Sequence, residues 1–226
     1  MTACASLNKP QLASPLGAGP QRPRGRPRKT EGERDDGNRR HELLAVAARL
    51  FRLQGFDATS TRDIAAAVGM RSGSPFYHFK SKGAMLFAVM EEGMRFAIAR
   101  QTQATEGVAP GANAARILIN RLIRAHFDTL LGPGNDFVPV MLYENRSLSA
   151  AQRHSLAKLQ AQYESAWTPV LDALYESGGL RCPVKLSRLL ILGALNWSVQ
   201  WFDAKKGASL DDLTEAATAL FFPPDR

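Results

Sequence analysis

The sequence predicts an all-α protein in which an N-terminal three-helix helix-turn-helix domain precedes a larger C-terminal helical domain. Apolar residues recur at helical spacing over most of the 226 residues, and no segment alternates apolar and polar residues as a half-buried strand does. Glycine and proline clusters divide this pattern into about nine helices, the first three of them short or closely spaced. We therefore expect two helical domains, at 38–82 and 83–226, behind an N-terminal arm at 1–37.

The composition indicates a globular protein with an anionic partner. Hydrophobic residues make up 45% of the chain and charged residues 22%, and the formal net charge is +8. Nucleic acid is the first candidate partner and a membrane surface the second. Because the sequence contains no apolar run of about 18 residues and no secretory signal, we expect a cytoplasmic, nucleoid-associated protein without a membrane partner.

Catalytic and metal-binding patterns are missing from the sequence. Cys4 and Cys182 lie in unlike contexts, and the four histidines show no metal-ligand spacing. There is also no nucleophile elbow and no glycine loop that could cradle a phosphate. We therefore expect neither an enzyme nor a metal site, cofactor or disulfide.

Residues 1–37 form a basic arm that we expect to be disordered, because they lack apolar periodicity. Within it, Arg24, Gly25, Arg26 and Pro27 resemble an AT-hook, in which Arg24 and Arg26 would enter a narrow A/T-rich minor groove. A plain basic tail that attracts phosphates without sequence preference explains the same residues equally well. Both interpretations remain open.

Three helices are predicted between residues 38 and 82. The first carries an apolar stripe through Leu43, Val46 and Phe51 and ends at Gly55. Ser60 and Asp63 predict a capping box for a second helix of about two turns. The third segment, 72–79, tolerates Pro75 because the missing N–H falls in its first turn.

This order of short helix, tight turn and second short helix is typical of a DNA-binding helix-turn-helix, whose recognition helix opens with small residues. Two short helices packed under a bundle would be the plainer explanation. The side chains that we expect to contact DNA lie at the start of the second helix and along the recognition helix: Thr61, Arg62, Ser72, Gly73, Ser74, Tyr77, His78, Lys80 and Lys82.

The region 39–90 resembles the first domain of the tetracycline-repressor (TetR) family of bacterial transcriptional regulators. The matching residues are Ser60, Ile64, Ala65, Gly69, Gly73, Ser74, His78, Phe79, Ser81 and Lys82. Pro75 stands where the family usually has Leu or Ile, and Phe76 replaces a phosphate-binding Tyr, so that contact is not expected here. Gly83 and Ala84 replace acidic residues that often follow in the family. The resemblance implies a homodimeric repressor of a roughly palindromic DNA operator.

The remaining sequence predicts helices from Ser81 to about 105 and over 112–131, 136–145, 149–177, 183–203 and 209–221. Pro169 should kink the helix at 149–177. The helix at 183–203 carries more apolar surface than a monomer can bury, which predicts dimerisation. The resemblance implies that the last two helices pair with their copies in a four-helix bundle.

The resemblance also implies a small-molecule effector site among these helices. Its candidate residues are Phe127, Met141, Tyr143, Trp167, Tyr175, Asn196 and Trp197. Aromatic residues at helical spacing are more often plain core, and that alternative stays open for each. A hydrophobic or acyl-CoA effector is expected first, and an aromatic compound or a drug is the alternative.

Overall fold

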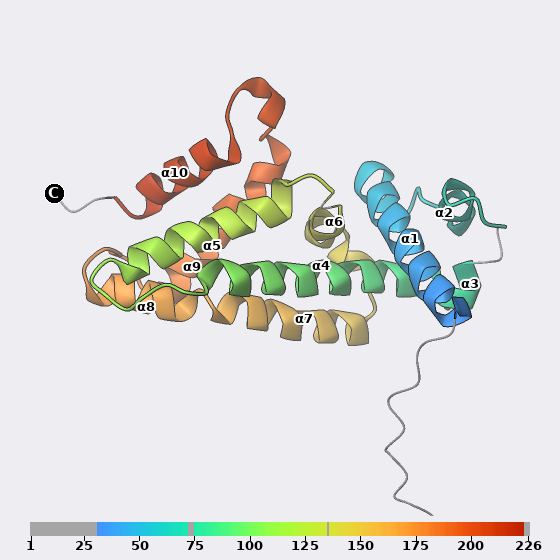
Figure 1. Cartoon of the computed structure of the whole chain (residues 1–226), viewed down its shortest axis with the longest axis horizontal. Coiled ribbons are helices and arrows are strands. Elements are labelled where there is room, and N and C mark those ends of the chain that lie inside the picture. Colours follow the sequence, from blue (N-terminus) through green and yellow to red (C-terminus); the bar gives the residue numbers. More distant parts are fainter. Residues whose placement is uncertain (1–30, 72–74, 135, 224–226) are drawn as a thin grey trace, which may run out of the picture.

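The computed structural model describes residues 31–71, 75–134 and 136–223, and all regular secondary structure in these ranges is helical. The first three helices are α1 (Glu31–Gln54), α2 (Thr61–Ala67) and α3 (Pro75–His78). They lie at one end of the long helix α4 (Lys82–Thr105), as Figure 1 shows. Helix α1 begins at Glu31, so the last part of the predicted arm is helical. Its first turns contain no apolar residue, and periodicity could not reveal them.

The predicted capping signals of this region are present. Gly55 has a φ of 82° and donates its N–H to the Phe51 carbonyl at 3.0 Å, which ends α1 in the left-handed conformation that glycine favours. The Ser60 hydroxyl accepts from the Asp63 N–H at 3.1 Å, and the Asp63 carboxylate accepts from the Ser60 N–H at 2.8 Å. This capping box starts α2.

The rest of the chain forms α5 (Ala114–Leu131), α6 (Phe137–Glu144), η1 (Asn145–Ser147), α7 (Ala150–Ser165), α8 (Thr168–Glu176), α9 (Val184–Trp197), η2 (Ser198–Gln200), η3 (Ala204–Lys206) and α10 (Leu210–Phe221). The single helix expected over 149–177 is divided into α7 and α8, and Pro169 lies in the first turn of α8. A proline inside a continuous helix would clash with the carbonyl of Ser165, so the chain breaks here instead of bending. Helix α9 ends at Trp197, before the predicted 203.

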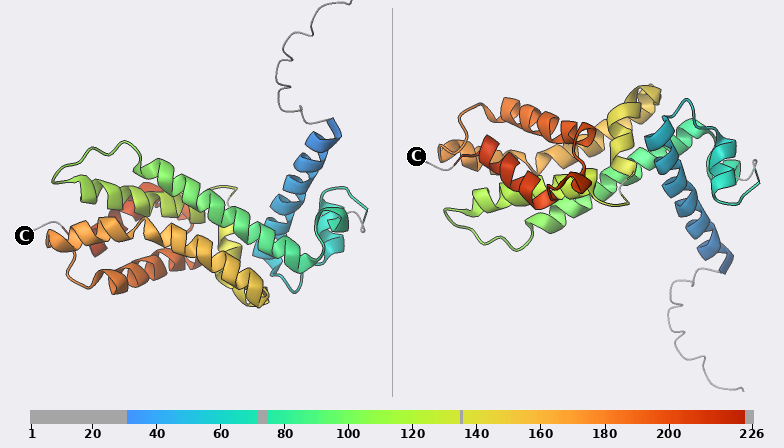
Figure 2. Two further views of the ribbon diagram at one scale, coloured as in Figure 1. Left: turned by 90° about the horizontal axis from the view of Figure 1, so that it is seen from below. Right: turned by 90° about the horizontal axis from the view of Figure 1, so that it is seen from above.

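Buried apolar side chains form two separate cores. The first core joins α1, α2, α4, α6 and α7 and includes Leu44, Phe51, Leu86 and Leu156. The second core joins α5, α8, α9 and α10 and includes Trp167 and Leu171. Figures 1 and 2 show the same division, with α1, α2 and α3 at one end of the molecule and α5, α8, α9 and α10 toward the other. Helix α4 also packs against α5 and so connects the two halves.

Helix α6 is attached to the helix-turn-helix domain by polar contacts near both of its ends. The Arg52 guanidinium lies 2.8 Å from the Asp136 carboxylate, just before α6. At the other end, Glu144 accepts a 2.9 Å hydrogen bond from the N–H of Phe56, in the loop between α1 and α2. Helix α6 also passes close to Gly93 of α4. A Cβ atom added at Gly93 would lie only 3.1 Å from Cβ of Phe137, so a larger residue would push the two helices apart.

Candidate DNA-binding surface and effector cavity

The helix-turn-helix domain exposes several of the predicted contact residues. Tyr77 is 80% exposed and packs edge-on against His78, with the ring centroids 5.2 Å apart. Arg62 and Lys80 are exposed, whereas Thr61 and His78 are half-buried. The other predicted contacts, Ser72, Gly73, Ser74, Arg24 and Arg26, lie outside the described residues.

Lys82 is engaged within the domain itself. Its ammonium group donates to the carbonyl oxygens of Phe56 at 2.7 Å, Thr59 at 2.9 Å and Asp57 at 3.5 Å, and it lies 4.2 Å from the centre of the Phe56 ring. An ammonium group has three donors, and these carbonyl groups occupy them. Lys82 thus ties the start of α4 to the loop between α1 and α2, and its contact with DNA stays a prediction.

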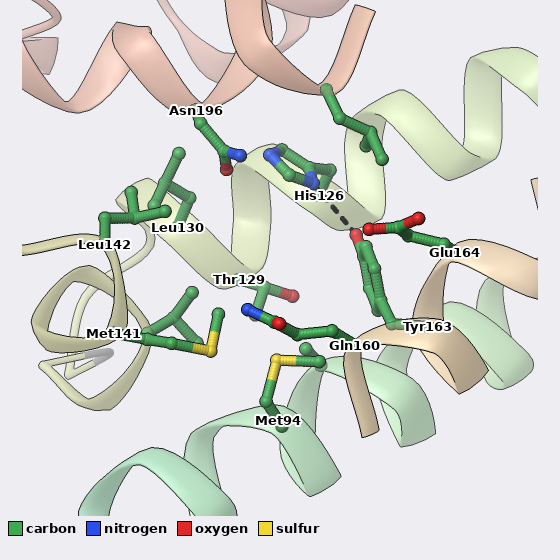
Figure 3. Close-up of a pocket in the computed structure, with 13 residues that line it drawn as sticks. Met94, His126, Thr129, Leu130, Met141, Leu142, Gln160, Tyr163, Glu164 and Asn196 are labelled. Carbon is green, nitrogen blue, oxygen red and sulfur yellow. Dashed lines mark hydrogen bonds between the residues drawn. The ribbon is translucent and has the colours of Figure 1, made fainter. Parts of the chain in front are cut away.

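A cavity of about 110 Å³ lies where the two cores meet (Figure 3). Helices α4, α6 and α7, which belong to the first core, form one wall, and α5 and α9 of the second core form the other. Its lining residues are Met94, Ala97, His126, Thr129, Leu130, Val138, Met141, Leu142, Gln160, Tyr163, Glu164, Leu192 and Asn196. Tyr163 packs against both cores, so it links the two walls.

Polar groups gather on one side of this mainly apolar cavity. Nδ1 of His126 lies 2.8 Å from the Tyr163 hydroxyl, and the Asn196 amide lies beside the other ring nitrogen (Figure 3). His126 is 8% exposed, and this burial lowers its pKa to about 4, an effect that Asn196 partly offsets. Burial also raises the pKa of Tyr163 above its usual value. Both side chains are therefore neutral at pH 7.

The candidate effector residues fall into three groups. Met141 and Asn196 line the cavity. Phe127 and Trp167 are at most 1% exposed and belong to the second core. They are core residues, which was the alternative to effector binding in the sequence-based prediction. The other three residues are exposed to solvent: Tyr143 to 43%, Tyr175 to 49% and Trp197 to 65%. The hydroxyl of Tyr143 also accepts a hydrogen bond from Gln200.

Five polar lining residues were not among the candidates predicted from the sequence: His126, Thr129, Gln160, Tyr163 and Glu164. His126 and Thr129 are three residues apart and share the buried face of α5, among apolar neighbours. Polar residues on such a face are unusual enough to indicate a buried site. That pattern was visible in the sequence.

Exposed apolar side chains of α9, of Trp201 just after η2, and of α10 form an apolar surface. Its exposed residues are Leu186, Leu189, Leu190, Trp197, Trp201 and Leu220. A wider and more open hollow of about 540 Å³, lined in part by Leu190 and Leu220, lies beside it. No helix in the described part of the chain is long and apolar enough to cross a membrane. Within the same residues, no group of three or more His, Cys, Asp or Glu side chains could hold a metal ion.

Comparisons with known proteins agree with this architecture. Residues 43–89 match the model of the tetR family of bacterial regulatory proteins, and residues 117–223 match the tetracyclin repressor-like C-terminal domain. The transcriptional repressor KstR2 of Rhodococcus jostii is 28% identical over 78% of this chain and 86% of its own. The structure of the superantigen PfiT is 37% identical, with a TM-score of 0.68 over 82% of this chain and 97% of PfiT.

The structure of AibR in complex with isovaleryl coenzyme A and operator DNA has a TM-score of 0.75, at 22% identity, over 83% of this chain and all of AibR. Both halves of the molecule therefore match TetR-type domains in the expected order. The chain belongs to the TetR family and is a DNA-binding transcriptional regulator.

Proposed function

We propose that this regulator is a homodimeric repressor that a largely apolar effector, an acyl-CoA thioester in the first place, releases from its operator. The observation that carries the proposal is the position of the cavity, which lies between the core that includes the helix-turn-helix domain and the core that does not. A ligand in this position contacts both halves and can favour one relative arrangement of them. Two of the similar proteins agree with this proposal: KstR2 is named a repressor, and AibR binds isovaleryl coenzyme A and operator DNA.

The proposed dimer interface is the exposed apolar surface of α9, η2 and α10. Leu190 is 67% exposed, Trp197 65% and Leu220 75%. Large contiguous apolar surfaces of this kind are rare on monomeric proteins. A two-fold dimer would also place two recognition helices on the DNA, with half-sites about one helical turn apart.

On the DNA side, we propose that α3 enters the major groove with Tyr77 on its exposed side and Lys80 just after its end, while Arg62 at the start of α2 contacts the phosphate backbone. Ser72, Gly73 and Ser74 remain proposed backbone or base contacts on the basis of the sequence. Arg24 and Arg26 remain proposed contacts of the arm, either in the minor groove or with phosphates.

The proposed route from the cavity to the DNA runs through α6. Met141 and Leu142 of this helix line the cavity, and Glu144 at its end holds the N–H of Phe56. A ligand that displaces α6 would therefore pull on the loop between α1 and α2, which Lys82 ties to α4. A ligand shifts such an equilibrium only by its difference in affinity for the two states, and a tenfold loss of DNA affinity needs about 1.4 kcal/mol.

The test begins with footprinting of the DNA that flanks the gene, followed by titration of the protected site in the presence of acyl-CoAs. We expect a two-fold symmetric footprint and at least tenfold weaker operator binding with one acyl-CoA of the panel. Operator DNA must then weaken the binding of that acyl-CoA by the same factor, because the coupling is reciprocal.

Glu144→Ala is the matched variant for the proposed route. It removes the acceptor of the Phe56 N–H but no cavity-lining residue, so it should keep effector affinity and lose most of the effector's influence on DNA binding. A monomer in solution together with an asymmetric footprint would contradict the dimeric repressor. If only aromatic compounds or drugs release the protein from the operator, the effector belongs to that alternative class and not to the acyl-CoAs.

A further inference from the structure

The cavity contains a buried polar atom without a partner, and this atom indicates the chemistry of the ligand. His126 is 8% exposed and lines the cavity, yet its Nε2 makes no hydrogen bond within the described residues. A buried polar atom without a partner costs about 1–3 kcal/mol. A ligand that supplies the missing partner gains this interaction on binding.

The hydrogen bond at the other ring nitrogen determines what kind of partner Nε2 needs. The Tyr163 hydroxyl lies 2.8 Å from Nδ1 and shares a hydrogen bond with it. Tyr163 stays protonated because burial raises its pKa, so its hydroxyl can donate to Nδ1, and we infer that it does so here. Burial lowers the pKa of His126 to about 4, so the ring is neutral at pH 7. With Nδ1 as the acceptor from Tyr163, its one proton lies on Nε2. Nε2 is therefore a donor, and it needs an acceptor.

A second donor lies next to the first. Figure 3 shows the side-chain nitrogen of Asn196 beside Nε2 of His126. In this orientation of the Asn196 amide the two N–H donors do not satisfy one another, and a single oxygen placed between them could accept from both. A carbonyl oxygen, with two lone pairs, suits this arrangement.

The charge of the lining disfavours a carboxylate in the same place. The lining contains no lysine or arginine, and its one charged residue is Glu164. Arg188 is not among the lining residues; its terminal nitrogens lie 3.1 Å from Glu164 and 2.9 Å from the Thr168 hydroxyl, while its buried Nε makes no hydrogen bond in the described structure. An anionic ligand would therefore meet a neutral histidine and a carboxylate, with no free cation in the cavity to offset the loss of its hydration.

We propose that the cavity recognises a neutral carbonyl group, as in a ketone or a thioester, whose oxygen accepts hydrogen bonds from Nε2 of His126 and from the Asn196 amide. The inference rests on the proposed function only in placing the effector in this cavity. The volume of about 110 Å³ is smaller than a cavity of about 150 Å³ that holds a benzene ring. The cavity therefore holds a carbonyl group with a short chain, and the rest of a larger effector lies outside it.

Two ligands that differ only in the carbonyl group provide the binding test. Isovaleryl-CoA is compared by calorimetry with its thioether analogue, S-isopentyl-CoA, in which a CH₂ group replaces C=O. We expect the thioester to bind about tenfold more tightly, as the loss of a hydrogen bond to buried donors predicts. Free isovalerate should bind more weakly than either compound. In His126→Leu, the thioester and the thioether should bind alike.

A measurement on the unmodified protein covers the case in which His126→Leu does not fold. Nitrogen-15 NMR of the histidine rings should find the His126 proton on Nε2, and the uncharged ketone 4-methyl-2-pentanone should shift that Nε2 signal. The exposed His154 serves as the control, which the ketone should leave unchanged. A proton on Nδ1, an unshifted Nε2 signal, or equal affinity of the wild-type protein for thioester and thioether would each overturn the inference.

The two proposals fail in different ways. If the ketone shifts Nε2 while no acyl-CoA weakens operator binding, carbonyl recognition stands and the acyl-CoA effector is wrong. If acyl-CoAs release the operator while the thioether releases it equally well, the effector class stands and carbonyl recognition is wrong.

Discussion

The two cores of this protein serve different surfaces. The first core buries side chains from α1 and α2 together with α4, α6 and α7, so the helix-turn-helix domain shares its interior with one wall of the cavity. The second core belongs to α5, α8, α9 and α10, whose outer side carries the exposed apolar surface. One core thus supports DNA binding, and the other supports the proposed dimer interface.

This division explains how one small cavity could control both surfaces. A ligand between two rigid cores needs to change only their relative position, because well-packed interiors resist internal deformation. The boundary is bridged by the extensive packing of α4 against α5, and by Tyr163 and its hydrogen bond to His126. The following predictions test whether the cores behave as separate units, from the largest effect to the smallest.

Truncation of one buried leucine in each core should separate their stabilities. Leu86 and Leu171 are both fully buried, and replacing either by alanine should cost about 2–5 kcal/mol of unfolding free energy. In a Trp197→Phe, Trp201→Phe background, Trp167 fluorescence reports the second core, while circular dichroism reports all helices. Leu86→Ala should lower the circular dichroism midpoint more than the fluorescence midpoint, and Leu171→Ala should not. Equal shifts of both midpoints in both variants would mean that the cores unfold as one unit.

Acidification should destabilise the boundary through His126. Its folded pKa of about 4 lies below the ordinary value of 6.5, so the unfolded chain binds the proton first. The contribution of His126 to the free energy of unfolding should therefore fall as the pH drops from about 6.5 to about 4, by up to about 3 kcal/mol, and should change no further below that range. Denaturant titrations of the wild type and His126→Gln at several pH values isolate this contribution, because the other groups cancel in the difference. A constant difference between the two proteins from pH 7 to pH 4.5 would contradict the assignment.

Lys82→Met should destabilise the first core without removing an ionic contact to DNA phosphates. Its lost hydrogen bonds to Phe56 and Thr59 should cost about 1–3 kcal/mol of stability and weaken operator binding without changing its salt dependence. The exposed Lys80 is the matched control, since Lys80→Met should keep stability and reduce the salt slope by about one. Thermal melts and DNA titrations at several salt concentrations measure both effects. If Lys82→Met also reduced the salt slope, Lys82 would contact a DNA phosphate after all.

The smallest effect is expected for the ion pair between Arg52 and Asp136. Both side chains are partly exposed, at 38% and 28%, so water screens their attraction. A double-mutant cycle with Arg52→Met and Asp136→Asn should give a coupling energy of roughly 0.5 kcal/mol in unfolding free energy. A coupling above about 2 kcal/mol would show that this pair, and not the Glu144 contact, is the main attachment of α6.

The sequence predicted the helical class and the helix-turn-helix because these depend on local signals. The capping box at Ser60, the stop at Gly55 and the apolar stripe of α1 each involve residues within one or two turns of one another. Pro169 was recognised as a disturbance, but whether it bends or breaks a helix depends on how the following segment packs, and here α8 packs into the second core.

The cavity could be predicted only in part, because its walls come from five helices that are distant in the sequence. Large aromatic residues such as Trp167 were expected to line it, yet they fill the core, where they bury the most apolar surface. The hydrogen bonds of Lys82 could not be predicted either, since the carbonyl groups that accept them lie more than 20 residues earlier in the chain. Long-range contacts of this kind leave no periodic pattern in the sequence.

Most of the cavity lining lies outside both cores, and this has a consequence for how such a regulator diversifies. His126, Thr129, Gln160, Glu164 and Asn196 belong to neither set of buried apolar side chains. Substitutions at these positions can alter which molecule is sensed without disturbing the interior that holds the DNA-reading helices. Selection could thus exchange the chemical input of the regulator while its target genes stay the same, and a biosensor could be retuned by the same route.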